Sequence, residues 1–593
     1  RVASLSSVEK LQKEKLDNNE IAKKLTSRYV VSGSIWKIDS IFQLSMELFD
    51  TGDEKLLASQ RWEMNWKDLP ILKKNLSKKI IEGLDIQIIN ELDINNSIDP
   101  IAYELYLKGK HTFEKRQKVE DIEIARDFFL KALELDSNFI EARYVFGNTY
   151  HDSEKDIAMK HYELALKKAN EFDDKKAKMD IKRSMGHIYA EQMEVDRTLS
   201  LYRQSLKISK EIGNKSSMAD VMNNIGAHFW ERGISDSARY YFDSAYDIIK
   251  ELGDKVKLLR NRNNMALIHW QFDNDLEKGI LNFEESISYI EELEIKNITA
   301  PYVNLGIIHL NVKRDFKRSR EYFDKVIKNA SSVDNRNQLI FGNYWLGIYN
   351  LQLFEHEKAI EYLNKSYKLS TDLGFERLIA NSLAYLIACH EYLNNKPLVK
   401  KYFDKSYEMK SIFSGDIYKW AGIQLMWQGN HQLSNTLFSE LLKIEKKNSN
   451  ENGIINVLTN IGLNYFYKGD YKKALENFNL AIDQRGEKEL FNVVETLTFK
   501  HLANEELGVS EDDNFLRDYI NKKMEADSNW FKNEPEYINW ALYEYFGEDK
   551  YIIEAKRKLD LVLDNIDPDK LKNLSSYSAY QVILDSYNNM QNL

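Results

Sequence analysis

The chain has 593 residues, of which 43% are hydrophobic and 12% aromatic, so it can bury more than one compact domain or a repeat array. Its net charge of −10 is spread along the sequence without a long run of Lys and Arg, which argues against a nucleic acid partner. One cysteine excludes an internal disulfide framework and a cysteine-rich zinc site, and it favours a cytoplasmic protein. The most apolar window, residues 339–354, is too short and too polar for membrane insertion.

Residues 1–90 alternate β-forming residues with turn signals, and they predict a small α/β domain. Turn residues such as Gly52 and Asp53 separate segments that are rich in Val, Ile, Phe and Trp. The expected strands are 28–38, 41–51 and 55–65, and the expected flanking helices are 18–25 and 68–84.

From about residue 98 to residue 487 the sequence repeats itself. A short motif, NNIGAHF at 223 and TNIGLNY at 459, returns at intervals of 35 to 41 residues. One residue of this motif, called the key position below, is mostly glycine; its successive occupants are Gly186, Gly226, Ala266, Gly306, Gly347, Ile387, Gly422 and Gly462. Such a period predicts a solenoid of about ten two-helix repeats.

Each repeat has a regular internal spacing. The best copies place a small residue 12 positions after the key position, an aromatic residue or Leu at 16, and another small residue at 19, as in Ala238, Phe242 and Ala245. The spacing predicts small residues where two antiparallel helices approach closely, with the aromatic ring filling the gap between successive pairs. Helix ends in the left-handed conformation are predicted at Gly213, Gly253 and Gly374.

This pattern resembles the tetratricopeptide repeat, in a long variety of about 40 residues per repeat. The resemblance covers about two thirds of the chain. It implies stacked helical hairpins with a concave groove that is lined by the first helix of each pair.

Asparagine recurs two residues before the key position, at Asn224, Asn264, Asn304 and Asn460. Asparagine is a middling helix former without apolar surface, so its recurrence needs a reason. In tetratricopeptide arrays this position points into the groove, where a carboxamide can donate to and accept from a peptide backbone. Trp230 and Trp270, six residues further on, would add apolar surface to the groove. The alternative, that the asparagines bridge adjacent repeats, is weighted equally.

No catalytic, cofactor or metal site is predicted. The sequence lacks a Gly-rich GK[ST] turn, H-E-x-x-H, G-x-S-x-G and the kinase motifs. His269, His309 and His390 fall three residues after the key position, where other copies carry aromatic residues, so packing is favoured over metal binding. Cys389 and His390 are adjacent on a helix, where their side chains diverge by about 100°, which disfavours a thiolate–imidazole pair.

The segment from EIAKKL at 20 to DPIAYELYLKGKH at 99 resembles the TolB-like domain that precedes tetratricopeptide repeats in bacterial signalling proteins. In that family the segment often follows a class III adenylate/guanylate cyclase domain. The family's first strand and helix would lie before Arg1, so the resemblance implies a truncated domain.

The predicted fold is mainly α: a tetratricopeptide helical-hairpin superhelix (α-solenoid), preceded by a small truncated α/β domain. The predicted domains are 1–90 (TolB-like), 98–487 (repeats) and 488–593 (a helical cap that covers the last apolar face). The expected function is non-catalytic binding of a protein or peptide segment in the groove, in bacterial signalling. The alternative is the C-terminal regulatory part of a class III nucleotide cyclase whose catalytic domain lies upstream of Arg1.

Overall fold

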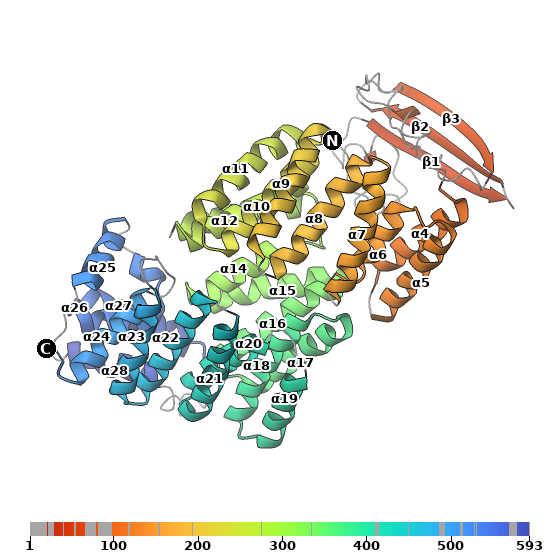
Figure 1. The fold of residues 1–593 in the computed structure, drawn as a ribbon. Helices are drawn as coiled ribbons and strands as arrows, with labels where there is room; N and C mark the ends of the chain where they lie inside the picture. Colours follow the sequence, from red (N-terminus) through yellow and green to blue (C-terminus); the bar gives the residue numbers. More distant parts are fainter. Residues whose placement is uncertain are drawn as a thin grey trace. The chain divides into compact units, whose positions relative to one another are not determined.

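A computed structural model describes residues 20–21, 29–38, 41–51, 55–65, 79–80 and 98–591, apart from 117–118, 152–153, 193, 274, 334, 409–413, 449, 486–492, 510–513, 527, 529 and 568–577. These residues form three strands, β1–β3, and 25 α-helices, α4–α28 (Figure 1). The chain divides into two compact units, a first unit, Arg1–Ile295, and a second unit, Lys296–Leu593. Each unit is described by itself.

The N-terminal strands of the first unit form one antiparallel sheet. The strands are β1 (Tyr29–Ile38), β2 (Ile41–Asp50) and β3 (Lys55–Asn65), in the order β1-β2-β3. Alternate residues of β2, among them Phe42, Met46 and Leu48, are buried on one face, as the two-residue period of a strand dictates. The three predicted strands are therefore confirmed, whereas the predicted helices at 18–25 and 68–84 lie almost entirely outside the described residues.

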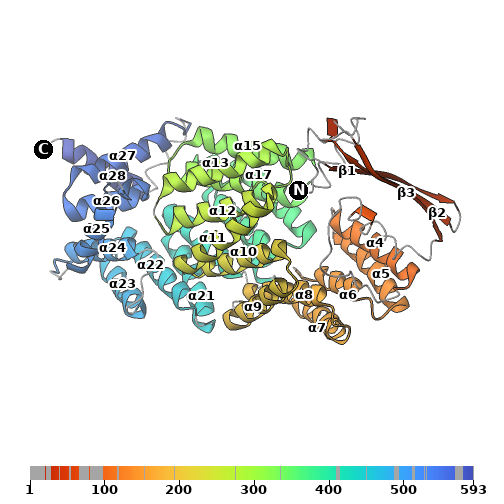
Figure 2. The same ribbon diagram turned by 90° about the horizontal axis from the view of Figure 1, so that it is seen from above.

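Five consecutive helix pairs follow the sheet within the first unit (Figure 2). Their bounds are α4 (Pro100–Glu114), α5 (Val119–Leu135), α6 (Ile140–Asn148), α7 (Lys155–Glu171), α8 (Lys175–Glu191), α9 (Val195–Glu211), α10 (Lys215–Glu231), α11 (Ser235–Leu252), α12 (Lys255–Gln271) and α13 (Leu276–Glu292). In each pair the even-numbered helix is the first helix and the odd-numbered helix the second.

Five further pairs begin the second unit, and five more helices follow them. The pairs comprise α14 (Ala300–Asn311), α15 (Phe316–Ser332), α16 (Arg336–Gln352), α17 (His356–Leu373), α18 (Glu376–Tyr392), α19 (Lys396–Glu408), α20 (Ser414–Trp427), α21 (His431–Lys447), α22 (Glu451–Tyr467) and α23 (Tyr471–Arg485). The later helices are α24 (Val493–Glu506), α25 (Asn514–Ala526), α26 (Glu536–Phe546), α27 (Asp549–Leu563) and α28 (Ser578–Gln591).

The key position explains why these helices pair. A Cβ atom added to Gly226 would lie 2.7 Å from the ring of Phe242, 16 residues on, and one added to Gly462 would lie 2.5 Å from the ring of Phe478. Glycine therefore lets the ring of the second helix lie directly on the backbone of the first. The aromatic residue thus fills the space within its own pair, and it also reaches the next one, since Phe242 shares a buried cluster with Met265 of α12.

The helix ends follow the local sequence. Gly213, Gly253 and Gly374 have φ values of 65°, 64° and 74°, so the predicted left-handed residues are confirmed. At the next helix start, the Asn214 and Asp254 side chains accept hydrogen bonds from backbone N–H groups three residues on. Each turn thus ends one helix and begins the next within a few residues.

The expected fold class, a mainly α array of tetratricopeptide-type hairpins preceded by a small sheet, is confirmed. The compact units do not follow the predicted domain limits, because the division after Ile295 falls inside the repeat region. The limits at 90, 98 and 487 remain predictions. After the last pair, the helices share a core with it: Ala474 and Phe478 of α23 lie in one cluster with Phe499 of α24 and Ile552 of α27.

Candidate peptide-binding groove

The asparagines define one face of each first helix. Residues at −3, −2, +1, +4 and +5 relative to the key position lie on neighbouring lines of a helix, because side chains three and four positions apart share a face. We call these five positions the asparagine face. It includes the recurrent asparagines at −2, and Trp230 and Trp270 at +4.

In the first unit, Asn224 joins two repeats. Its Nδ2 lies 3.3 Å from Nε2 of His187, on the first helix of the preceding pair. The other ring nitrogen of His187 lies 2.9 Å from the hydroxyl of Tyr202. Burial, with smaller contributions from His151 and Arg183, lowers the pKa of His187 to about 4, so this bridge contains a neutral imidazole at neutral pH. For Asn224 the geometry is that of the bridging alternative.

Asn264 occupies the same position one repeat later and differs from Asn224. Its side chain is half-buried, and its carboxamide makes no hydrogen bond with the described residues. A carboxamide in this state has its donors and its acceptor available to a ligand.

The remaining two asparagines lie in the second unit. Asn304 is half-buried on α14. Asn460 is also half-buried, and its Nδ2 donates to the carbonyl of Asn456 in its own helix at 2.8 Å. Because the two units are not placed relative to one another, a continuous row from Asn224 to Asn304 remains a prediction.

A bridging asparagine that the sequence did not reveal is Asn261. It is fully buried on α12, and its Nδ2 donates to Oδ1 of Asn223 at 3.1 Å and to the carbonyl of Phe242 at 2.9 Å. It lies five residues before the key position, where Val221 and Val457 stand in other repeats, so no recurrence pointed to it.

The two tryptophans are half-buried and lie near the start of the second helix of their pairs. Trp230 packs against the cluster that contains Ala238, and its Nε1 is buried without a partner among the described residues. The Cβ of Trp270 lies 3.2 Å from the place that a Cβ of Gly279 would occupy. Both indoles thus have a packing role, and they leave part of their surface on the asparagine face.

The asparagine face differs in chemistry between the units. In the first unit it is mostly polar across α8, α10 and α12: Arg183, Ser184, His187, Glu191, Asn223, Asn224, Glu231, Asn263, Asn264 and Gln271. In the second unit it is mostly apolar or aromatic: Val303, Ile307, Leu310, Tyr344, Trp345, Ile348, Leu351, Tyr385, Trp420, Ile423, Met426, Trp427, Leu463, Phe466 and Tyr467. There, the rings of Tyr344 and Tyr385 lie 5.8 Å apart and those of Tyr385 and Trp420 lie 6.4 Å apart.

The three histidines that share a repeat position, His269, His309 and His390, are buried. The rings of His309 and His390 lie 5.6 Å from those of Tyr322 and Tyr402, on the second helix of each pair, while Nδ1 of His269 lies 2.6 Å from Oδ2 of Asp273. Across the described part of the chain, no three His, Cys, Asp or Glu side chains come together as metal ligands would. Cys389 is fully buried, and burial raises the pKa of its thiol.

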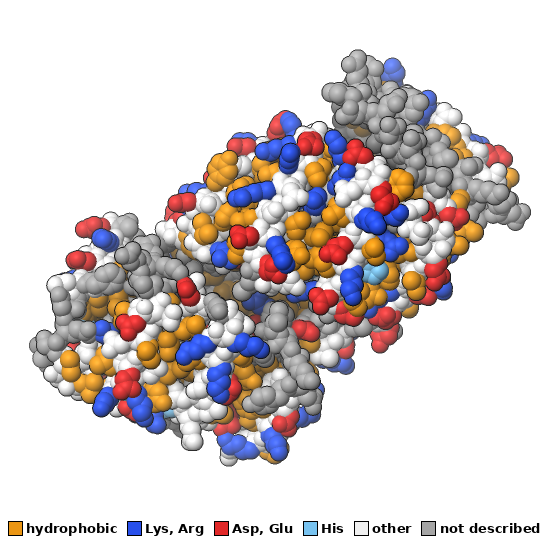
Figure 3. Space-filling model, viewed as in Figure 1, with side chains coloured by type: hydrophobic (Ala, Val, Ile, Leu, Met, Phe, Trp, Pro, Cys, Tyr) orange, Lys and Arg blue, Asp and Glu red, His pale blue; other side chains and the backbone are white. Residues whose placement is uncertain are grey.

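Surface charge and hydropathy add two observations. Lys, Arg, Asp and Glu side chains are interspersed over the visible face rather than gathered by sign (Figure 3). None of the helices in the described residues combines the length and the hydropathy that a bilayer crossing requires.

The helix pairs define a repeat protein of tetratricopeptide-type hairpins, and a tetratricopeptide repeat family model matches residues 455–487, the α22–α23 pair. No curated protein sequence matches the chain at a significant level.

Among solved structures, yeast Tom70 resembles the chain with a TM-score of 0.30 at 15% identity, over 81% of this chain and 96% of Tom70. A Rap protein complexed with Competence and Sporulation Factor gives 0.37 at 16% identity, over 52% of this chain and 85% of that one. Aspartyl phosphate phosphatase F from Bacillus subtilis gives 0.38 at 13%, over 69% and 100%. All three TM-scores are below 0.5, and the fold assignment rests on the helices themselves.

Proposed function

We propose that the chain is a non-catalytic scaffold of bacterial signalling that binds an extended protein or peptide segment on the asparagine face of the first unit. The observation that carries the proposal is the polar asparagine face of α8, α10 and α12. Carboxamides on consecutive repeats offer donors and acceptors, and a peptide backbone presents N–H and C=O groups in alternation. The half-buried Trp230 and Trp270 supply apolar surface beside them.

Asn264 is the most informative residue of this site. Its carboxamide is not engaged by the described residues, whereas that of Asn224 contacts His187. A loss of binding caused by Asn264→Ala would therefore report a contact with the ligand. A loss caused by Asn224→Ala would combine the ligand contact with the bridge between α8 and α10.

The test uses peptides selected from a displayed random library against the full chain, with affinities measured by fluorescence anisotropy. Asn264→Ala removes a hydrogen bond of about 0.5–1.5 kcal/mol, so the affinity should fall roughly two- to tenfold. The double variant Asn224→Ala, Asn264→Ala should bind at least about fivefold more weakly, at a minimum of about 0.5 kcal/mol for each lost bond. Asn460→Ala is the matched control, because its amide is bonded within its own helix.

Thermal midpoints of the same variants separate ligand contacts from structural ones. The midpoint of Asn264→Ala should match that of the unchanged chain. Unaltered peptide affinity in Asn264→Ala and in the double variant would contradict a groove on this face. So would selected peptides that do not compete with one another for binding.

The sheet β1–β3 is proposed to be part of a TolB-like domain, since the three strands coincide with the segments on which that resemblance rests. The association with a class III nucleotide cyclase is a further proposal that rests on the same resemblance. Synthesis of cyclic AMP or cyclic GMP by this chain from ATP or GTP would contradict the non-catalytic function.

A further inference from the structure

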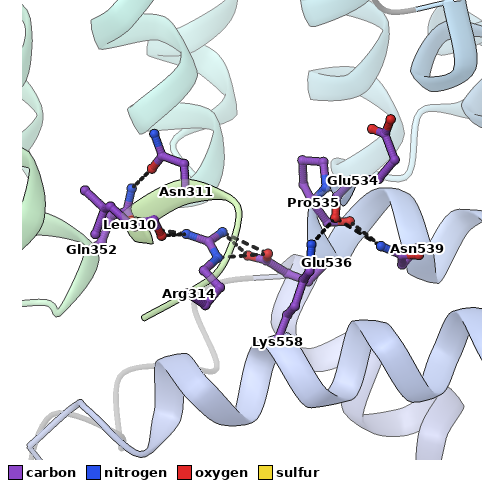
Figure 4. A network of polar contacts seen from close by, with 9 residues as sticks. All are labelled: Leu310, Asn311, Arg314, Gln352, Glu534, Pro535, Glu536, Asn539 and Lys558. Carbon is purple, nitrogen blue, oxygen red and sulfur yellow. Dashed lines mark hydrogen bonds and ion pairs between the residues drawn. The ribbon is translucent and has the colours of Figure 1, made fainter. Parts of the chain in front are cut away.

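A buried ion pair joins two segments of the second unit that are 222 residues apart in the sequence. Arg314 lies in the turn between α14 and α15, and Glu536 is the first residue of α26. Nη2 of Arg314 lies 2.6 and 2.8 Å from the two carboxylate oxygens of Glu536 (Figure 4). The side chains are 11% and 5% exposed, so neither charge is hydrated in this arrangement.

Further polar contacts surround the pair. Arg314 also donates to Oε1 of Gln352 at 2.9 Å, at the end of α16. On the other side, Lys558 of α27 donates to the carbonyl of Glu534 at 2.5 Å, and the Tyr537 hydroxyl donates to Glu495 at 2.7 Å. We call Arg314, Gln352, Glu495, Glu536, Tyr537 and Lys558 the polar seam.

Next to the polar seam, α26 and α27 cover residues of the asparagine face. The ring of Tyr537 lies 5.0 Å from that of Trp427, at the end of α20, and the ring of Trp540 lies 6.5 Å from that of Phe466, at the end of α22. Leu310 of α14 shares a core cluster with Val562, at the end of α27, and with Ile566, three residues beyond that end. The C-terminal helices thus pack on the asparagine face of the second unit.

At the Arg314 side, the polar seam makes this contact different from the cores of the helix pairs. Desolvation of two charges offsets much of their mutual attraction, so a buried ion pair adds less stability than apolar packing of the same volume. When the contact opens, both charges regain water. The cores of the helix pairs, in which rings pack against glycines, contain no charges among their described residues that would regain hydration on opening.

We propose that α26 and α27 act as an internal ligand of the second unit: they close the apolar asparagine face in cis and can open at the Arg314 side, while the apolar clusters that they share with α24 and α25 hold their other side. The preferred ligand of this face is then an amphipathic helix that carries a carboxylate at its N-terminal end, opposite Arg314. Aromatic residues follow at one and four positions beyond the carboxylate, as Tyr537 and Trp540 follow Glu536. This inference concerns the second unit and does not rest on the peptide site proposed for the first.

The first test is hydrogen exchange of the full chain with Glu536→Arg, Arg314→Glu and both changes together. Each single change should raise exchange at least tenfold in α26 and α27 and in the ends of α14, α20 and α22, and it should leave the α16–α17 pair protected. The double change restores the pair with reversed charges and should restore protection. Exchange like that of the unchanged chain, or loss of protection throughout the second unit, would overturn the proposal.

The second test adds a synthetic peptide of residues 535–566 to the full-length chains. The Glu536→Arg chain keeps Arg314 and displaces its own α26, so it should bind the peptide at least tenfold more tightly than the unchanged chain does. Arg314→Glu repels the peptide carboxylate and should bind it no better than the unchanged chain. Equal peptide binding by all three chains would overturn the assignment. A dimer of the unchanged chain with exchanged C-terminal helices would also overturn it, because a second copy would then occupy the face.

Discussion

The two units contain the same kind of helix pair, but their asparagine faces differ in polarity. In both, a ring at 16 or so residues beyond the key position lies on the first helix, as Phe242 does in the first unit and Phe478 in the second. The asparagine face of the first unit is polar, whereas that of the second is aromatic and lies under α26 and α27. The packing of a pair therefore does not determine what its exposed face binds, which depends on positions that packing leaves free to vary.

The largest expected effect on stability comes from breaking the buried ion pair of the second unit, compared with breaking an exposed ion pair in the first. Glu536→Gln leaves Arg314 charged, buried and without its counter-ion, which should lower the free energy of unfolding by about 3–5 kcal/mol. Asp173→Asn, which removes the partner of Lys178, should change it far less, since Asp173 is 76% exposed. Urea denaturation measures both changes in the free energy of unfolding. Equal changes would contradict the prediction that the buried ion pair matters more.

One buried group in each unit should make stability depend on pH, and the two dependences have opposite signs. Burial raises the pKa of Glu495 to about 7, a hydrogen bond from Tyr537 opposes that rise, and Glu534 adds to it. Above an unfolded-state pKa of about 4.5 the unfolded chain ionises Glu495 and the folded chain does not, so stability falls as pH rises. Between pH 5 and 7 the contribution of Glu495 should lower the free energy of unfolding of the second unit by about 1 kcal/mol per pH unit, and Glu495→Gln should remove this contribution.

His187 gives the first unit the reverse dependence. Its pKa of about 4 in the folded chain lies below the ordinary value of 6.5, so its contribution is complete above pH 6.5 and is lost as pH falls towards 4. Hydrogen-exchange protection of each unit, corrected for the intrinsic pH dependence of exchange, measures both slopes. Parallel slopes in the two units would contradict the assignment of these two groups.

A smaller effect should be the same in both units, because it concerns the pairs themselves. Ala238→Leu and Ala474→Leu each force extra volume into a fully buried position of the second helix, and each should cost about 1–3 kcal/mol. Denaturation midpoints that stay unchanged would mean that these alanines do not lie at close helix contacts.

The smallest effect concerns the bridge between α8 and α10. Asn224→Ala removes the contact with His187 and should lower stability by about 0.5–1.5 kcal/mol. Asn460→Ala removes a bond within one helix turn and should cost less, because the freed carbonyl of Asn456 remains bonded along the helix. A larger loss of stability in Asn460→Ala than in Asn224→Ala would contradict this prediction.

The sequence predicts what recurs. The key positions, the ring 16 residues on, the left-handed glycines and the three strands each depend on local periodicity, and the structure has them where they are expected. The candidate site is predicted less fully. The recurrence of Asn224, Asn264, Asn304 and Asn460 indicates a shared position, yet the four carboxamides have different surroundings because their neighbours are not repeated.

The ion pair of Arg314 and Glu536 cannot be predicted from sequence recurrence either, because neither residue is repeated. Each residue occurs once, outside the repeat register, and their contact depends on how the C-terminal helices return to α14. A charged residue in a turn and a glutamate after Pro535 are ordinary surface patterns in a sequence. Only the fold makes them partners.

Cys389 offers a consequence of a different kind. It is the one thiol of the chain, and it lies fully buried on α18 among the residues of the largest core cluster of the second unit. A thiol reagent can therefore modify the protein only after this core has opened. The rate of modification then measures the rate at which the core opens. A cysteine placed at an exposed site such as Tyr240 would carry a fluorophore without competition from the native thiol, so partner binding and core opening can be followed separately in one molecule.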